Sequence, residues 1–128
     1  MIRIINHSDR REHTRPLFNK LYILRLEEIH LYKVALIMFK VYHNDTPRVF
    51  CNLFTRNFEV HNYGTRQATQ FHVPNARTNY MKRAISVKGV CIWNKLSRKV
   101  NNDCSFLSFK ISLKKYIISN SDIVTYVC

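Results

Sequence analysis

The sequence predicts a mainly α-helical fold with a small β-ribbon, an α+β class folded as one compact helical domain. Its 128 residues include only two glycines and three prolines, fewer than the turns of a many-stranded sheet need. Apolar residues make up 46% of the chain and aromatic residues 12%, which offsets the entropy of ordering and argues against disorder. The longest apolar segments repeat at helical spacing. Together these observations favour helices around one modest core.

The N-terminal part of the chain predicts one short helix. Residues 2–5 are apolar, and we interpret them as the end of an element that begins upstream; a charged loop follows at 8–13. Thr14 is expected to cap a helix whose first turn contains Pro16, where the missing N–H leaves no helical bond unmade. The apolar face of this helix consists of Leu17, Phe18, Leu21 and Tyr22.

The helix expected over residues 26–43 is apolar around most of its circumference and is therefore predicted to be the core helix. Glu27 and Glu28 stand in its first turn, where the helix dipole favours anions. Its narrow polar stripe carries His30, Lys33 and Lys40. We interpret this stripe as a solvated edge, with phosphate contact as the alternative.

A second short helix is predicted directly after the core helix. Asp45 or Thr46 caps it and Pro47 takes its first position, so that residues 48–54 form two turns. The apolar side chains expected to pack inward are Val49, Phe50, Leu53 and Phe54.

The middle of the chain is less regular and predicts the β-ribbon. Loose alternation favours a short strand at 70–73 and a partner strand at 83–87, with Gly89 allowing the chain to turn. Residues 90–96 are then expected to form a short helix that buries Ile92 and Leu96 with Trp93. Trp93 is therefore predicted to anchor the core in preference to stacking on a base.

The last predicted helix follows a capping Ser105 and repeats apolar residues at helical spacing from Phe106 to Ile117. Lys110 and Lys114 lie on its opposite side, so its outer face is basic.

These elements predict a single domain over residues 1–118, followed by a tail at 119–128 that carries no interpretable pattern. The domain has three expected parts: helical at 1–56, basic and irregular or β at 57–104, and the terminal amphipathic helix at 105–118.

The charge of the chain calls for an acidic partner. The formal net charge is +13 and the pI is near 10. Residues 60–128 hold eleven Lys or Arg against two acids, and residues 60–102 hold no carboxylate at all. A long cationic stretch without acids predicts contact with the phosphates of RNA or DNA. The alternative is a basic surface that serves solubility alone.

Cations and aromatic residues alternate within this stretch, as they do in proteins that bind single-stranded nucleic acid. The candidate phosphate contacts are Arg66, Arg77, Lys82, Arg83 and Lys88. Tyr63 is the candidate for stacking on a base; Phe71 is a second, and either residue fits the core equally well. Loop architecture is the favoured role for His61.

The sequence predicts no catalytic residues, no metal site and no cofactor, so we expect neither an enzyme nor a small-molecule substrate. Its four cysteines include no C-x-x-C pair, and no Ser/His/Asp or Cys/His arrangement stands out. Buried thiols fit a reducing, intracellular compartment, nuclear or cytoplasmic. No signal peptide is visible and the most apolar run, at 34–39, is far too short to cross a bilayer, so no membrane partner is expected.

Seven short motifs stand in order along residues 2–118. They are RII (3–5), TRPLFNKL (14–21), FKVYHN (39–44), HNYGTR (61–66), VPNARTN (73–79), SVKGVCIWNKL (86–96) and SFLSFKISLKKY (105–116). The series resembles the C-terminal segment of reverse transcriptases from jockey-like non-LTR retrotransposons. In that family the segment follows the polymerase palm and runs from a thumb-like helical part into a tail.

This resemblance implies a non-catalytic domain that holds template RNA or target DNA, with the palm of the parent RNA-directed DNA polymerase as a further partner. The polymerase needs a pair of adjacent aspartates to hold two metal ions, and no Asp-Asp pair occurs in this chain. Two departures stand out: Ser97 replaces the proline that usually follows the W-N-x-L motif, and residues 119–128 match nothing in the family. The alternatives are a protein-interaction module that docks on the polymerase and a decayed, non-functional fragment.

Overall fold

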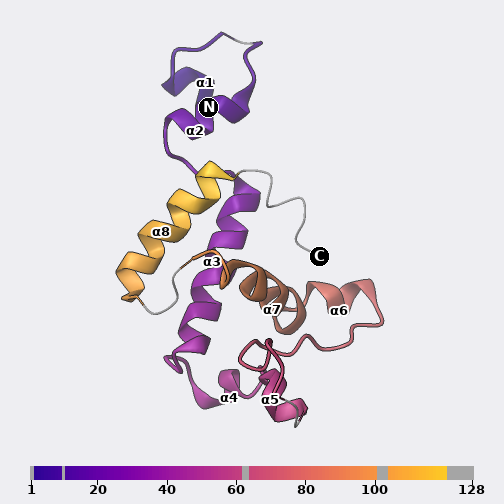
Figure 1. Ribbon diagram of the computed structural model, residues 1–128. Helices are drawn as coiled ribbons and strands as arrows, with labels where there is room; N and C mark the ends of the chain where they lie inside the picture. Colours follow the sequence, from indigo (N-terminus) through magenta and orange to yellow (C-terminus); the bar gives the residue numbers. More distant parts are fainter. Residues whose placement is uncertain (1, 10, 62–63, 101–103, 121–128) are drawn as a thin grey trace.

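The computed structural model describes residues 2–9, 11–61, 64–100 and 104–120, and within them the backbone is mainly helical. The helices are α1 (Ile2–Ile5), α2 (Thr14–Lys20), α3 (Leu26–Tyr42), α4 (Arg48–Cys51), α5 (Asn57–Val60), α6 (Asn79–Arg83), α7 (Ile85–Leu96) and α8 (Phe106–Ser119). Figure 1 shows α3 as the long central helix, with α8 beside it, α7 across it and the α1–α2 pair beyond one end. The predicted helical class is confirmed.

The core lies where α7 and α8 pack on α3. Ala35 and Met38 of α3 are fully buried. The Phe39 ring stacks on Phe109 of α8 with centroids 4.3 Å apart and meets the edge of Trp93 of α7 at 6.3 Å. The predictions of a core helix over 26–43 and of Trp93 as a core anchor are therefore both confirmed.

The N-terminus of α3 is fixed by a buried carboxylate. Glu28 is only 2% exposed, and its Oε1 accepts hydrogen bonds from the Arg25 guanidinium at 2.8 Å. Its Oε2 accepts the Arg25 backbone N–H, also at 2.8 Å, so the side chain satisfies a donor that the helix itself leaves unpaired. Glu28 therefore acts as a cap and as a charge partner at once.

Replacing Glu28 with Ala is expected to lower the free energy of unfolding by about 1–3 kcal/mol, because it removes the carboxylate that the Arg25 backbone N–H and guanidinium both contact. Glu27→Ala is the matched control, since Glu27 is exposed in the same turn and its loss should change stability by no more than about 0.5 kcal/mol. Urea unfolding of the two variants measures the difference. Equal midpoints would show that the cap contributes nothing.

The predicted β-ribbon is not present in the described residues, where the only bridge is an isolated one between Arg56 and Phe71. Residues 83–87, predicted as a strand, form the end of α6 and the start of α7. The alternation of apolar and polar residues suggested a strand here. In the structure Val87 and Val90, three residues apart, lie on one face of a helix and are both buried. The short helix predicted at 90–96 is correspondingly longer.

Gly89 serves close helix packing, and the prediction that it allows a turn was wrong. It lies inside α7 against α3, and a Cβ added there would stand 3.1 Å from Met38 Sδ and 3.2 Å from Ile85 Cγ1. A leucine at 89 should overpack this contact and lower the free energy of unfolding by about 1–3 kcal/mol. Thermal unfolding of Gly89→Leu measures the loss, and a variant as stable as the parent would contradict the packing described.

The first predicted helix is confirmed in position but differs at its ends. Thr14 is the first residue of α2, and His13 takes the N-cap position without a side-chain bond. Leu17 is buried as expected. Tyr22 lies beyond the helix at a positive φ of 52° and is 68% exposed, so it does not extend the apolar face.

The helix predicted at 48–54 is a single turn, α4, preceded by Pro47 at the N-cap position. Phe54 is buried and Phe50 packs partly against the core, as predicted. Val49 and Leu53 are instead exposed, because one turn of helix presents only part of its circumference to the core.

Helix α8 confirms the predicted terminal helix. Phe109, Leu113 and Ile117 recur every four residues and are fully buried. Ser105 takes the predicted N-cap position, although its side chain makes no capping bond. The tail predicted as unassigned, 119–128, lies outside the described residues beyond Asn120.

Candidate nucleic-acid interface

Four of the six predicted site residues lie close together in sequence around α6. Arg77 precedes the helix, Lys82 and Arg83 form its last turn, and Lys88 lies in the first half of α7, which contacts α6. The Thr78 hydroxyl accepts the Met81 N–H at 3.2 Å and caps α6. We call residues 73–88 the α6 corner; Figure 1 shows it at the side of the molecule opposite α8.

The cations of the α6 corner are not used to hold the fold. Arg77, Lys82 and Arg83 are exposed and Lys88 is half-buried. Within the described part of the chain, none of these four side chains makes a hydrogen bond or an ion pair. Arg25, by contrast, is bound to Glu28. Their charge is therefore available to a partner.

The aromatic residues of the basic stretch divide sharply by burial. Phe71 and Trp93 are 4% and 2% exposed and belong to the core, whereas Tyr80 on α6 is 86% exposed. Phe71 is thus excluded as a stacking platform. Tyr63, the predicted platform, lies outside the described residues.

Tyr80 was missing from the predicted site, although the sequence contains a signal for it. The residues three and four positions away on either side of Tyr80 are arginine or alanine, so a helix predicted here would give Tyr80 no large apolar neighbour on its own face. In the structure Tyr80 lies on α6 and is 86% exposed, on the same short helix as the exposed Lys82 and Arg83.

An open hollow of about 520 Å³ lies in the same corner. Its walls are mainly apolar and Lys82 is the one charged residue among them. The lining residues are Val73, Pro74, Asn75, Ala76, Lys82 and Val87. The corner therefore combines unpaired cations, an exposed aromatic ring and apolar surface, which is the set of groups that holds a strand by its phosphates and its bases.

Arg66 belongs to a different part of the molecule. It is exposed in the turn at 64–70, which is bonded to α5: the Phe58 N–H donates to the Ala68 carbonyl at 3.1 Å, and the Asn57 amide donates to the Gln67 carbonyl at 2.9 Å. In Figure 1 this end of the molecule lies below α7, beside α5. The structure therefore does not place Arg66 within the α6 corner.

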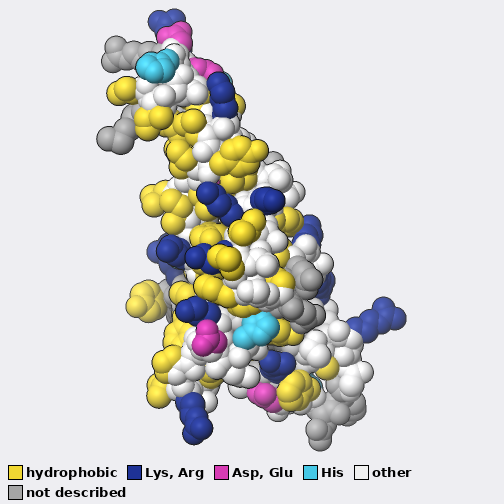
Figure 2. Space-filling view, turned by 90° about the vertical axis from the view of Figure 1, so that its left-hand side faces the viewer, with side chains coloured by type: hydrophobic (Ala, Val, Ile, Leu, Met, Phe, Trp, Pro, Cys, Tyr) yellow, Lys and Arg dark blue, Asp and Glu magenta, His cyan; other side chains and the backbone are white. Residues whose placement is uncertain are grey.

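A second basic surface runs over α8 and the adjoining edge of α3, and we call it the α8 face. Lys40 and Lys110 lie over the Phe106 ring at 5.3 and 5.5 Å from its centroid. Leu107 and Ile111 are 65% and 51% exposed on the same helix. Figure 2 shows Lys, Arg and apolar side chains interspersed over this face.

The described residues contain no group of three His, Cys, Asp or Glu side chains that could hold a metal ion. Cys51, Cys91 and Cys104 are half-buried and form no disulfide within the described residues. No helix in the described ranges is long and apolar enough to span a bilayer.

Comparison with known proteins adds no further guide. The sequence matches no protein-family model, and neither the curated proteins nor the solved structures contain a significant match to it.

Proposed function

We propose that this domain binds nucleic acid through the α6 corner, with little dependence on sequence. The observation that carries the proposal is the group of four cations at residues 77–88 whose side chains form no ion pair in the described structure. They lie in a stretch of 43 residues, 60–102, without a single carboxylate. A surface kept free of neutralising acids is suited to a polyanion.

Phosphate contacts supply affinity in this proposal, and they carry no sequence information. Each contact releases condensed counterions, so flexible lysines and arginines suffice without fixed geometry. Tyr80 adds stacking on an unpaired base, which every base accepts because each has a π-face. The corner therefore favours single-stranded RNA or DNA over duplex.

The motif order along residues 2–118 supports a parent protein: the reverse transcriptase of a non-LTR retrotransposon, with this domain at its C-terminal end. The mainly helical fold is compatible with the thumb-like part that this resemblance implies. In this proposal the domain holds template RNA or target DNA beside the palm, and the catalytic aspartates belong to the palm.

The proposal is tested by fluorescence anisotropy with labelled single-stranded RNA, single-stranded DNA and duplex DNA, each in several unrelated sequences of one length. We expect single strands to bind more tightly than duplex, with dissociation constants that differ by only a few-fold between sequences. Absence of binding, or a strong preference for one sequence, would contradict the proposal.

Tyr80→Ala is expected to weaken binding of single strands by about tenfold or more, since stacking on one base contributes about 1–3 kcal/mol. Tyr80→Phe keeps the ring and should retain the affinity. The free energy of unfolding should stay within about 0.5 kcal/mol of the parent in both variants, because the side chain is exposed. If both variants bind as the parent does, Tyr80 has no part in the interface.

A second candidate function is docking on the polymerase, favoured by Leu107 and Ile111 on the α8 face. Exposed apolar side chains rimmed by polar ones are typical of a surface that meets another protein. Reversing two charges of the α6 corner with Lys82→Glu and Arg83→Glu separates the candidates. Under the first, oligonucleotide binding is abolished; under the second, the little binding expected of any cation falls only slightly.

A further inference from the structure

A pocket of about 370 Å³ lies at the C-terminal end of α3. This volume falls within the roughly 300–1,000 Å³ range of small-ligand sites. The pocket is enclosed by the end of α3, the α4 segment and the bridge between Arg56 and Phe71. Its lining residues are Val41, Asn44, Cys51, Asn52, Phe54, Thr55, Arg56, Glu59 and Phe71.

Arg56 is positioned in this pocket by aromatic rings. Its guanidinium carbon lies 5.2 Å from the Tyr42 ring centroid and 5.9 Å from that of Phe71, so both rings restrict its side chain. Its Nη2 donates to the Tyr42 carbonyl at 3.5 Å, the outer limit of a hydrogen bond. Of the five donors of this guanidinium, no other is paired within the described residues.

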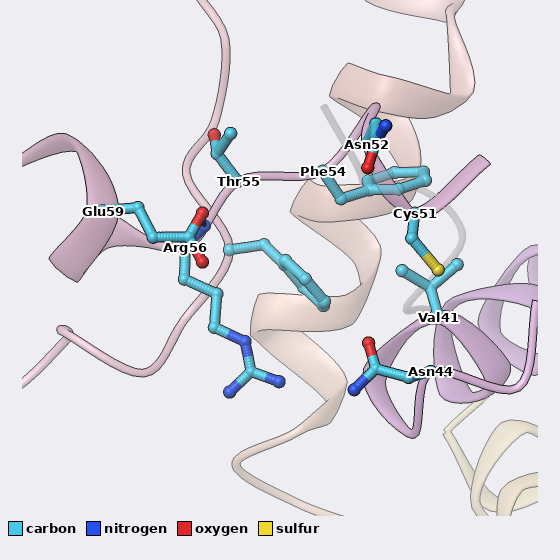
Figure 3. Close-up of a pocket in the computed structure, with 9 residues that line it drawn as sticks. Val41, Asn44, Cys51, Asn52, Phe54, Thr55, Arg56 and Glu59 are labelled. Atoms are coloured by element: carbon cyan, nitrogen blue, oxygen red, sulfur yellow. Dashed lines mark hydrogen bonds between the residues drawn. The ribbon is translucent and has the colours of Figure 1, made fainter. Parts of the chain in front are cut away.

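The nearest acid in the pocket does not neutralise Arg56. Glu59 accepts the backbone N–H of Arg56 at 3.2 Å and forms no ion pair with the guanidinium. Figure 3 shows the Glu59 carboxylate on the backbone side of Arg56, away from the guanidinium. The Arg56 guanidinium therefore lines the pocket without an ion-pair partner among the described residues.

Asn44 supplies a second donor on the opposite wall. Its φ of 56° lies in the left-handed region, which asparagine tolerates better than most residues. Its carboxamide has no hydrogen-bond partner among the residues described. Figure 3 shows this carboxamide and the Arg56 guanidinium pointing toward one another across the pocket.

We propose that the Arg56 pocket binds a terminal phosphate monoester, as carried by a free nucleotide or by the end of a nucleic-acid strand. A guanidinium fork and an amide donor match the oxygens of a tetrahedral oxyanion. A terminal group can enter a recess of this size from one side, whereas an internal diester has sugars on both sides. The choice of phosphate over carboxylate as the ligand rests on the proposed function. The pocket and its free donors are independent of that proposal.

The test compares an oligonucleotide with phosphate at its ends against the same oligonucleotide with hydroxyl ends, and adenosine monophosphate against adenosine. We expect the phosphorylated probe to bind about tenfold more tightly in at least one pair. A preference in the oligonucleotide pair identifies strand ends as the source, and a preference in the nucleotide pair identifies free nucleotide. No preference in either pair overturns the inference.

Two variants assign the preference to the pocket. Arg56→Met keeps an apolar stem against the Tyr42 and Phe71 rings, and Asn44→Gly keeps the positive φ while removing the carboxamide. Both variants should bring the ratio of the dissociation constants of the hydroxyl and phosphorylated probes close to one. Lys99→Gln removes an exposed charge outside the pocket and should leave the preference for the phosphorylated probe unchanged. A preference that survives both pocket variants also overturns the inference.

The two proposals fail separately. Oligonucleotides that bind equally well with either end group, together with equal affinities for adenosine monophosphate and adenosine, would leave the α6 corner in place and remove the pocket. Arg56-dependent binding of adenosine monophosphate without any oligonucleotide binding would do the reverse.

Discussion

Phe109→Ala is expected to lower the free energy of unfolding by about 3–5 kcal/mol, the largest loss of stability from any single substitution considered. Phe109 has no exposed surface and packs between Phe39, at 4.3 Å, and Trp93, at 6.0 Å between ring centroids. Its removal leaves a cavity at the junction of α3, α7 and α8. Domains of this size are stable by only about 5–15 kcal/mol, so the variant should unfold at markedly lower urea concentration.

Leu107→Ala is the matched control for this substitution. Leu107 lies two residues away on the same helix but is 65% exposed, so its truncation should cost no more than about 0.5 kcal/mol. Urea unfolding followed by circular dichroism gives both values. If the two variants lose stability equally, α8 does not pack on α3 through Phe109.

Neutralising the α6 corner is expected to produce the largest loss of function. In the triple variant Arg77→Gln, Lys82→Gln and Arg83→Gln, three exposed phosphate contacts disappear. If each contributes about 1 kcal/mol, the dissociation constant for single strands should rise on the order of 100-fold. Because these side chains hold no part of the fold together, the melting temperature should stay close to that of the parent.

A second triple variant controls for net charge. Lys20→Gln, Arg48→Gln and Lys99→Gln remove the same charge from exposed positions outside the corner. This variant should lose far less affinity. Equal losses in the two variants would show that the chain attracts nucleic acid by its total charge, with no defined interface.

The sequence was sufficient where a helix is long or strongly periodic. Helix α3 ends within one residue of its prediction, and the buried positions of α8 follow its apolar spacing. It was insufficient at 83–87, where a short segment satisfies strand and helix patterns alike. Packing decides such cases: Gly89 lets α7 approach Met38, and the helix extends back from that contact.

The sequence predicted the cations of the candidate interface but did not predict its exposed aromatic residue. Charge is a property of the local sequence, so Arg77 and Lys82 could be identified directly. Burial depends on tertiary contacts, and these placed Phe71 in the core while leaving Tyr80 exposed. Arg56 was missed for the same reason. The residues near it in sequence give no sign that its guanidinium contacts the rings of Tyr42 and Phe71.

The salt dependence of single-strand binding tests the central claim most directly. With about 0.7 counterions released per phosphate contact, the four cations of the α6 corner predict a slope near −3 in a plot of log affinity against log salt. The corner-neutralised triple variant should give a slope shallower by about 2. A flat plot for the parent protein, or parallel plots for parent and variant, would contradict the assignment of these cations to phosphate.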